Sequence, residues 1–97
     1  MELICSAVEQ QKLVTRDYTD QHGQQQKFRS VGVVLRVGND FLYCEGTHDL
    51  ADYLEKYPLK TGEHYVARIV WRTSEYTTGT GEKRTKVEGR LMSIVLL

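Results

Sequence analysis

The sequence feature that most constrains the fold is a strict alternation of apolar residues in residues 28–37. Every second position carries a β-branched or aliphatic side chain: Val31, Val33, Leu35 and Val37. Successive side chains of a strand point to opposite faces, so this spacing predicts a strand with one buried face. Residues 38–40, Gly-Asn-Asp, tolerate the backbone of a tight turn. A second, aromatic-rich strand over 41–44 completes a predicted hairpin.

The alternation stops at Gly46 and gives way to a helical spacing. Apolar residues now recur at i, i+3, i+4 and i+7: Leu50, Tyr53, Leu54 and Tyr57. That spacing places them on one stripe of a helix over residues 48–57. We expect the Thr47 hydroxyl to cap this helix by accepting a bond from a free N–H of its first turn. Pro58 forbids continuation.

Three further segments supply the remaining predicted strands. Residues 65–73 alternate again, and one face of that strand carries Tyr65, Ala67, Ile69 and Trp71. Residues 87–97 predict a final, largely buried strand, reached through a flexible, glycine-containing hairpin tip at 79–82. Residues 3–16 fit one long, bent strand. Residues 17–27 are polar and contain a glycine, so we expect a loop or a mobile β-ribbon there.

The predicted order of elements is strand, loop, strand, tight turn, strand, helix, strand, glycine-containing hairpin and strand. This order is typical of the five-stranded OB barrel, whose first strand is long and bent. Closure of the barrel buries the apolar faces together. We therefore predict an all-β chain that forms one OB-fold domain over residues 1–97, with one short helix between its third and fourth strands. A small α+β sheet with one helix lying across it is the alternative.

The charge balance limits the kind of ligand. Lys and Arg number 13, Asp and Glu also number 13, and the formal net charge is zero. This excludes a polycation that binds nucleic acid by bulk attraction, so a nucleic-acid site has to be a local patch. Cys5 and Cys44 belong to no CxxC pair, and we expect reduced, half-buried thiols rather than a disulfide scaffold or a zinc ribbon.

Several classes of site and location are not supported. No run of about 18 apolar residues occurs, and Met1–Cys5 lacks the basic start of a signal peptide, so we expect a cytoplasmic chain with no membrane partner. His22, His48 and His64 fall in different predicted elements without metal-ligand spacing. Residues 78–85 lack the spacing of a phosphate-binding P-loop. We expect no metal, no cofactor and no enzymatic activity.

Cations and aromatic rings are interleaved along several predicted strands. Binding of single-stranded nucleic acid needs both, because cations meet phosphates and exposed rings stack on bases. The candidate contact residues are Arg16, Tyr18, Lys27, Phe28, Arg29, Tyr43, Arg68, Arg72, Tyr76, Lys83 and Arg84. Arg16 and Tyr18 are the strongest candidates, because they flank the polar loop and strand geometry requires neither. Lys83–Arg90 is locally basic although the whole chain is neutral.

Other candidates also have a purely structural interpretation. Arg68 and Arg72 fit the solvated face of a strand. Tyr43 fits a core position with its hydroxyl in water. Residues 83–86 fit a charged edge that discourages aggregation of strands. Phe28 fits a cap on the barrel as well as a stacking position, so the sequence leaves both uses open.

Short motifs that cover most of the chain occur in the order seen in one known family. They are Val14-Thr15-Arg16 before the polar loop, Val37–Phe41 at the turn, Thr61–Val66 at the start of a late strand, and Gly89–Met92 followed by Ile94–Leu96 at the end. With these motifs the chain resembles the single-stranded DNA-binding, or helix-destabilising, proteins of filamentous bacteriophages. A definite helix at 48–57 and a longer hairpin at 76–86 depart from that family.

The resemblance implies a homodimer that binds single-stranded DNA cooperatively and tolerates many sequences. It also implies that the dimers coat viral single-stranded DNA during replication in the host cytoplasm, and that some RNA is bound. Independently, Val34, Val66 and Val70 on outward faces offer apolar area for a twofold contact. The alternative function is a protein-interaction OB domain that holds a partner on the same barrel face or on the helix stripe, with no nucleic-acid role.

Overall fold

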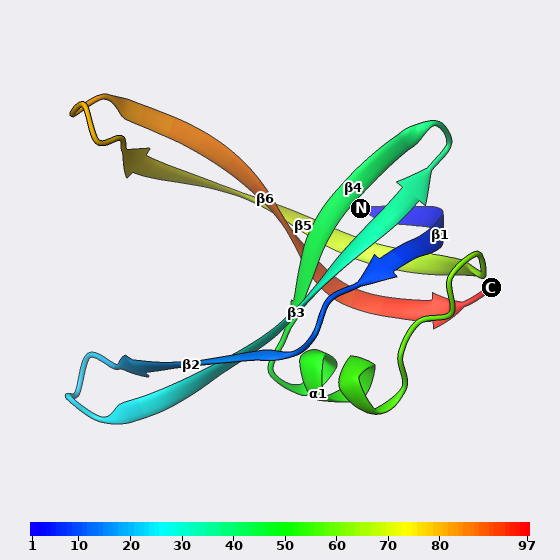
Figure 1. The fold of residues 1–97 in the computed structure, drawn as a ribbon, viewed down its shortest axis with the longest axis horizontal. Coiled ribbons are helices and arrows are strands. Elements are labelled where there is room, and N and C mark those ends of the chain that lie inside the picture. The colour runs from blue at the N-terminus through cyan, green and yellow to red at the C-terminus, as the bar shows by residue number, and fades with distance from the viewer.

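A computed structural model describes all 97 residues, Met1–Leu97. The elements are β1 (Glu2–Gln10), β2 (Val14–Thr19), β3 (Gln25–Val37), β4 (Asp40–Thr47), α1 (Asp49–Lys56), β5 (His64–Thr77) and β6 (Lys83–Leu96). The strands form one sheet in the order β1-β5-β6-β4-β3-β2, and β1 also pairs with β3. That additional pairing closes β1, β5, β6, β4 and β3 into a barrel (Figure 1), so the predicted all-β OB fold with one short helix is confirmed.

The predicted long first strand over residues 3–16 is two strands instead. β1 pairs with β5 over residues 2–6 and with β3 over residues 6–10, and it ends at Gln10. Its pairing with β3 contains a register shift between Ala7 and Glu9. The side-chain amide of Gln10 donates to Leu54 O at 3.0 Å and accepts from Leu59 N–H at 2.9 Å. Gln10 is thus fastened to the end of α1, and the chain leaves the barrel after it as β2.

Residues 17–27, predicted as a loop or a mobile β-ribbon, belong to a regular ribbon. Pairing of β2 with β3 continues to Thr19 opposite Gln25. The Asp20 carboxylate accepts two backbone N–H bonds of the turn, both at 2.9 Å, and Gly23 takes a φ of 77°. A turn closed by an aspartate and a glycine explains why a polar segment keeps strand pairing.

The helix ends as predicted but begins differently. α1 stops at Lys56, shortly before Pro58. The N-cap residue is His48 rather than the predicted Thr47, and no side chain caps the helix. Thr47 is still the last residue of β4, and His48 N–H donates to Arg29 O at 2.9 Å, so strand pairing reaches the helix start and displaces the hydroxyl cap. No helix of the chain is long and apolar enough to cross a membrane.

α1 covers one end of the barrel. Ala51 and Leu54 are the buried residues of the helix. A Cβ atom on Gly46 would come within 3.2 Å of the Leu50 side chain, so the helix rests directly on β4 at a position that only glycine fits without a shift. Of the predicted apolar stripe, Leu50 and Leu54 therefore face the barrel.

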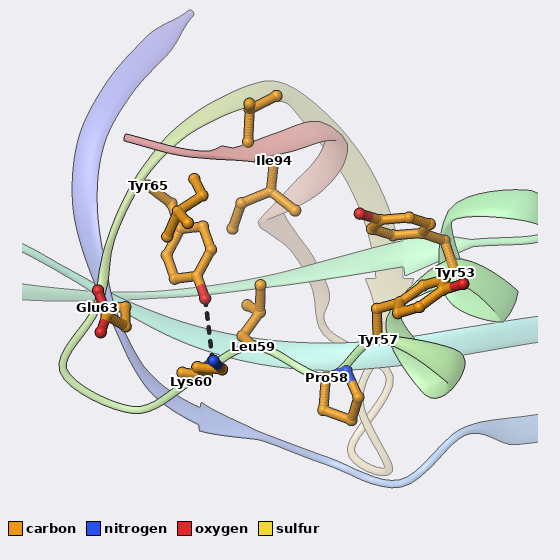
Figure 2. Close-up of a pocket in the computed structure, with 10 residues that line it drawn as sticks. Tyr53, Tyr57, Pro58, Leu59, Lys60, Glu63, Tyr65 and Ile94 are labelled. Atoms are coloured by element: carbon orange, nitrogen blue, oxygen red, sulfur yellow. Dashed lines mark hydrogen bonds between the residues drawn. The ribbon is translucent and has the colours of Figure 1, made fainter.

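The rest of the stripe borders a pocket of about 460 Å³ (Figure 2). Tyr53 and Tyr57 line one side, the loop over 58–63 lines another, and the end of β6 completes it. The Tyr65 hydroxyl accepts a bond from Lys60 N–H at 3.0 Å and holds the loop in place. Tyr53 of α1 and Tyr57 directly after it remain more than half exposed, at 53% and 56%.

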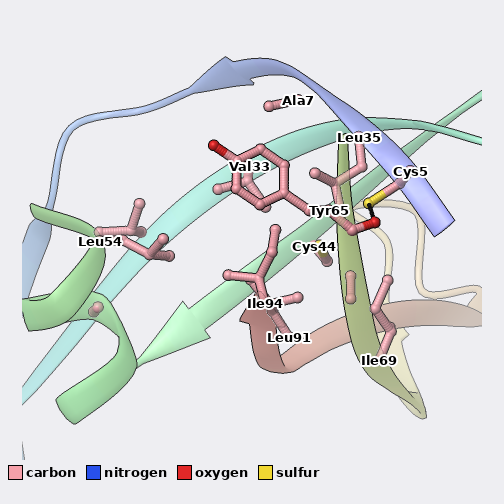
Figure 3. Packing of buried hydrophobic residues seen from close by; sticks show 13 residues of the cluster. Cys5, Ala7, Val33, Leu35, Cys44, Leu54, Tyr65, Ile69, Leu91 and Ile94 are labelled. Carbon is pink, nitrogen blue, oxygen red and sulfur yellow. Dashed lines mark hydrogen bonds between the residues drawn. The ribbon is translucent and has the colours of Figure 1, made fainter. Parts of the chain in front are cut away.

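The barrel core is formed by the inward side chains of the strands (Figure 3). Those that are essentially inaccessible include Val31, Val33, Leu35, Ile69 and Leu91. The predicted alternation of residues 28–37 is therefore confirmed as the inner face of β3. Cys5 and Cys44 are free thiols, fully buried rather than half-buried, and burial raises the pKa of the Cys44 thiol to about 12, so it stays protonated.

β6, predicted to be largely buried, is mostly exposed, and its buried residues are Leu91 and Ile94. The difference arises because β6 begins outside the barrel, in a hairpin with the end of β5. We call residues 72–88 the β5–β6 arm and residues 14–29 the β2–β3 arm; both project from the barrel (Figure 1). The radius of gyration is 15.2 Å, above the value of about 13 Å for a compact domain of this size, as two projecting arms require.

Candidate nucleic-acid interface

One face of the β2–β3 arm carries Arg16, Tyr18 and Phe28. Arg16 pairs with Phe28, and Tyr18 lies two residues along the same strand. Paired residues of antiparallel strands project to the same side, and every second residue of a strand keeps that side. The face therefore continues along β3 through Gly32 and Val34 onto the outside of the barrel.

Tyr43 on β4 lies across this outer face. It pairs with Val34, and a Cβ atom on Gly32 would come within 2.5 Å of the Tyr43 Oη atom and 3.0 Å of its ring. The ring thus occupies the space that any other residue at position 32 would need. Tyr43 Oη lies 3.2 Å from Glu45 Oε1 and 3.4 Å from Gln11 Oε1. The ring is held at its hydroxyl end yet remains 49% exposed, as a stacking platform requires.

The pKa of the Tyr43 phenol depends on the groups around the ring. Partial burial raises the pKa of the phenol, Glu45 raises it further, and Arg16 lowers it. The phenol therefore stays protonated at neutral pH and donates its hydrogen. By strand pairing, Arg16 and Tyr43 both project to the outer side of β3, so the β2–β3 arm and β4 contribute to one surface.

A cleft of about 390 Å³ lies where β4 runs parallel to β6. Cys44 pairs there with Gly89, and Glu45 pairs with Arg90. The lining residues are Tyr43, Glu45, Arg72, Val87, Glu88, Gly89 and Arg90. The cleft therefore joins the exposed Tyr43 ring of β4 to two arginines, Arg72 of β5 and Arg90 of β6.

The β5–β6 arm extends the same face outward. Arg72 pairs with Glu88, and Tyr76 pairs with Arg84. These pairs alternate with residues of the opposite side, so all four side chains project to one side of the arm. Ser74 lies between Arg72 and Tyr76 on that side, and its buried Oγ has no hydrogen-bond partner.

Ion pairs leave some of these cations free and occupy others. Lys86 binds Glu88 at 2.7 Å, and this bond raises the pKa of Lys86 and lowers that of Glu88. Arg84 binds Glu82 at 3.1 Å. None of the ion pairs of the chain involves Arg16, Arg72 or Arg90. These three arginines are therefore available to an anionic ligand.

Most of the predicted contact residues thus lie on one continuous outer surface. Those that the strand pairing and the cleft bring together are Arg16, Tyr18, Phe28, Tyr43, Arg72, Tyr76 and Arg84. We call this surface the outer groove face. Phe28 is only half-buried, and its ring packs edge-on against His48 with centroids 5.1 Å apart. Phe28 therefore packs against the start of α1 and still borders the outer groove face.

Four predicted residues lie elsewhere. Lys27 and Arg29 project to the opposite side of the β2–β3 arm, and Arg29 makes a bidentate pair with Asp52 at 2.8 and 2.9 Å. Lys83 pairs with Thr77 near the tip of the β5–β6 arm, on the side opposite Arg84. Arg68 pairs with Glu2 and Ser93, so it lies where β5 runs between β1 and β6, away from β4.

The sequence interpretation did not identify Glu45 and Gly32 as parts of this site, and it included Arg90 only as the end of the locally basic segment. Arg90 and Glu45 meet only through the parallel contact of β4 with β6, a long-range pairing that no local pattern shows. Gly32 did carry a signal, because a glycine inside an alternating strand marks a close approach of another group. No group of three or more His, Cys, Asp or Glu residues that could hold a metal ion lies together.

Comparison with known proteins bears on the fold. No model of a protein family matches the chain, and no curated protein sequence does either. Among solved structures, the chain is similar to Rim1, a mitochondrial single-stranded DNA-binding protein of S. cerevisiae, with a TM-score of 0.57. The two share 12% sequence identity over 100% of this chain and 92% of that chain. At this identity the similarity establishes that the whole chain has the fold of that protein.

Proposed function

We propose that the chain is a non-enzymatic protein that binds single-stranded DNA with little sequence preference. The observation that carries the proposal is the cleft in which exposed Tyr43, seated over Gly32, lies beside the unpaired cations Arg72 and Arg90. A similar fold in a protein named for binding single-stranded DNA adds support. Rings and cations on one barrel face, between two arms, are what OB folds use to hold an oligonucleotide.

The mechanism follows from the chemistry of these groups. Arg16, Arg72 and Arg90 replace counterions on phosphates, and Tyr43 stacks on a base, each such stacking contact being worth about 1–3 kcal/mol. In a duplex the base faces are already stacked, so the groove face binds the unpaired form more tightly. Binding then shifts duplex DNA toward single strands by mass action and needs no ATP.

Zero net charge is compatible with this function. Charges farther away than about 8 Å are largely screened at physiological salt. Two acidic residues near the site are already paired: Asp52 of α1 is bound to Arg29 at 2.8 Å, and Glu88 of the cleft is bound to Lys86 at 2.7 Å. A phosphate at the cleft therefore meets the unpaired cations Arg72 and Arg90 against one unpaired carboxylate, Glu45.

The finer part of the proposal is that dimers coat viral single-stranded DNA cooperatively in a host cytoplasm, with some binding of RNA. For the dimer contact we propose the row of Ile4, Val66 and Val95, which pair across β1, β5 and β6 on the outside of the barrel. Ile4 is 64% and Val95 63% exposed. The three predicted valines do not form one patch, since Val34 lies beside Tyr43 and Val70 beside Arg90.

Titration with an oligo-dT strand tests the function. Trp71 reports binding, because its ring lies within 2.9 Å of the position that a Cβ of the cleft residue Gly89 would take. We expect its fluorescence to be quenched and log affinity to fall against log salt with a slope of about −2, at about 0.7 per phosphate contact of a single strand. An unchanged spectrum at low salt, together with no shift of the oligomer in a native gel, overturns the proposal.

Sedimentation tests the dimer separately. We expect a dimer of the 11.2 kDa chain at micromolar concentration. Ile4→Asp places a charge in the apolar row and should give a monomer that still binds oligo-dT. A wild-type monomer at that concentration contradicts the dimer and leaves DNA binding untouched.

A protein-interaction domain is the second candidate function. It is favoured by the pocket of about 460 Å³ beside α1, where Tyr53 and Tyr57 expose about half of their surface. Such a module predicts no response of Trp71 to oligo-dT at any salt concentration, so the same titration separates the two functions.

A further inference from the structure

One unpaired carboxylate lies inside the cleft that the proposed function assigns to DNA. Glu45 lines the cleft with Tyr43, Arg72 and Arg90, and it is half-buried. It forms no ion pair, unlike Glu88, the other carboxylate of the cleft. Its one side-chain hydrogen bond comes from the Tyr43 hydroxyl to Oε1 at 3.2 Å. The second oxygen, Oε2, is therefore available to accept a bond from a ligand.

A carboxylate at this place has to face bases rather than phosphates, because like charges repel. Tyr43 lies two residues before Glu45 on the same side of β4, since both project outward opposite Val34 and Gly32. A base stacked on the Tyr43 ring therefore presents its edge near Glu45. Phosphates on either side of that base are left to the arginines.

We propose that Glu45 makes the cleft select bases with an exocyclic amino group, and among pyrimidines cytosine over uracil and thymine. An ionised carboxylate can only accept hydrogen bonds. The N4 amino group of cytosine is the donor that carboxylate side chains accept from in base recognition. Uracil and thymine carry a carbonyl oxygen at that position, which would face Glu45 without a hydrogen. This inference rests on the proposed function and names the bases that the same cleft prefers.

The cations of the cleft complement this choice. Arg72 and Arg90 offer only donors, and the remaining edge of cytosine, N3 and O2, offers only acceptors. The N4 amino group of cytosine can therefore donate to Glu45 while N3 and O2 accept from Arg72 or Arg90, which line the same cleft. Uracil places a donor at N3 between two carbonyl groups and cannot satisfy both sides in the same pose.

The test compares oligodeoxycytidine with oligodeoxyuridine of equal length at neutral pH. The two pyrimidines have almost the same size and differ along the edge that Glu45 would contact. We expect the wild-type chain to bind the cytidine oligomer about fivefold more tightly, the factor that one net hydrogen bond gives. Fluorescence of Trp71 and competition against a labelled strand provide the two affinities.

Glu45→Gln is the decisive variant. Its amide oxygen keeps the bond from the Tyr43 hydroxyl, so the amide nitrogen takes the place of Oε2. This nitrogen can donate to the O4 carbonyl of uracil but cannot accept from the N4 amino group of cytosine. We expect the ratio of the two affinities to fall to one or below, and binding of the uridine oligomer to strengthen because the variant gains a donor and a like charge leaves the groove. Glu55→Gln removes the same charge from the exposed side of α1 and should keep the fivefold ratio.

The outcomes separate the two proposals. Equal affinity of the wild-type chain for both oligomers, or tighter binding of the uridine oligomer, overturns the base preference and leaves DNA binding standing. A fivefold ratio that survives in Glu45→Gln overturns the role of Glu45. No binding of either oligomer at low salt overturns the proposed function itself.

Discussion

The two halves of β3 differ in burial: one half lies in the barrel and the other in the β2–β3 arm. Between Val31 and Leu35 every second side chain is fully buried in the barrel, whereas Gln25, Gln26 and Lys27 are all exposed in the β2–β3 arm. β5 and β6 show the same contrast between their barrel halves and the β5–β6 arm. The barrel gains its stability from burial, and the arms carry much of the candidate groove face. Stability and binding should therefore respond to different substitutions.

The arms keep strand form with little apolar burial to support them. Pairing of β5 with β6 is unbroken from Ile69 to Thr77. Thr78 N–H donates to Glu82 O at 2.9 Å and closes the turn, in which Gly81 has a φ of 85°. Segments held mainly by exposed backbone hydrogen bonds open at lower free energy than a core. The arms can thus adapt to a bound strand while the barrel stays fixed.

The largest expected effect is on the barrel. Leu35→Ala removes a fully buried side chain and should lower the free energy of unfolding by about 2–5 kcal/mol, as large-to-small core substitutions do. Val87→Ala, at a residue 66% exposed in the β5–β6 arm, should change it by less than about 0.5 kcal/mol. Urea unfolding followed by circular dichroism measures both. Equal losses in the two variants would break the contrast between barrel and arms.

The next largest effect is on the affinity for DNA rather than on the stability of the fold. Tyr43→Ala should weaken oligo-dT binding by about 1–3 kcal/mol, the worth of one stacked base. Tyr57→Ala is the matched control, because Tyr57 is an exposed tyrosine directly after α1, beside the other pocket, with 56% of its surface accessible. Fluorescence titration gives both affinities. Equal binding by the two variants would move the stacking platform away from β4.

Gly32→Ala also tests the role of the Tyr43 ring, but it moves the ring instead of removing it. The new methyl group would come within 2.5 Å of the Tyr43 Oη atom, so the ring must shift. We expect a smaller loss of affinity than for Tyr43→Ala, of about 1 kcal/mol or less, because the displaced ring still offers a face. Unchanged affinity would mean that the seat of the ring over β3 does not matter for binding.

Arg72→Ala and Arg29→Ala compare the two sides of the arms. Arg72 faces the cleft without an ion pair, so its loss should weaken binding several-fold at low salt and reduce the salt slope by about 0.7 to 1. Arg29 projects to the other side and is bound to Asp52, so its loss should leave the slope unchanged. Affinities over a series of salt concentrations test this, and equal slopes for both variants would contradict the assigned groove face.

Periodicity in the sequence predicted the parts of the fold that local patterns determine. The alternation in residues 28–37 became the inner face of β3. Of the predicted helical stripe, Leu50 and Leu54 pack against the barrel, whereas Tyr53 and Tyr57 remain more than half exposed. Both patterns arise because the buried face of an element selects apolar residues, about every 3.6 residues in a helix and every second residue in a strand. The predicted tip at 79–82 also holds, since its glycine takes a positive φ.

The sequence could not show which side of an arm a cation occupies. Lys27, Arg29 and Lys83 alternate with groove residues, but the polar ribbon carries no apolar face from which a side could be assigned. The cleft depends on the parallel contact of Cys44 with Gly89, between segments far apart in the chain. Such pairings follow from closure of the barrel, and no local spacing contains them.

The smallest expected effect is on the turn of the β2–β3 arm. Hydrogen bonds to the Asp20 carboxylate, from Gln24 N–H first and also from the Gln26 side chain and His22 N–H, hold the pKa of Asp20 below its ordinary value. A lowered pKa means that the carboxylate stabilises the turn fully above the unfolded value of about 3.9 and loses this effect as pH falls through the folded pKa.

Acid titration followed by amide chemical shifts should therefore show His22 and Gln24 changing with a midpoint below about 3.9, the ordinary value for aspartate. Over the same range the amides of Val33 and Leu35 should stay constant, because the barrel core contains no carboxylate. Asp20→Asn keeps an acceptor oxygen but cannot titrate, so its turn amides should lose the pH dependence. A midpoint at or above the ordinary value would show that the turn is not held by Asp20, and barrel amides that shift with it would mean that arm and barrel unfold as one unit.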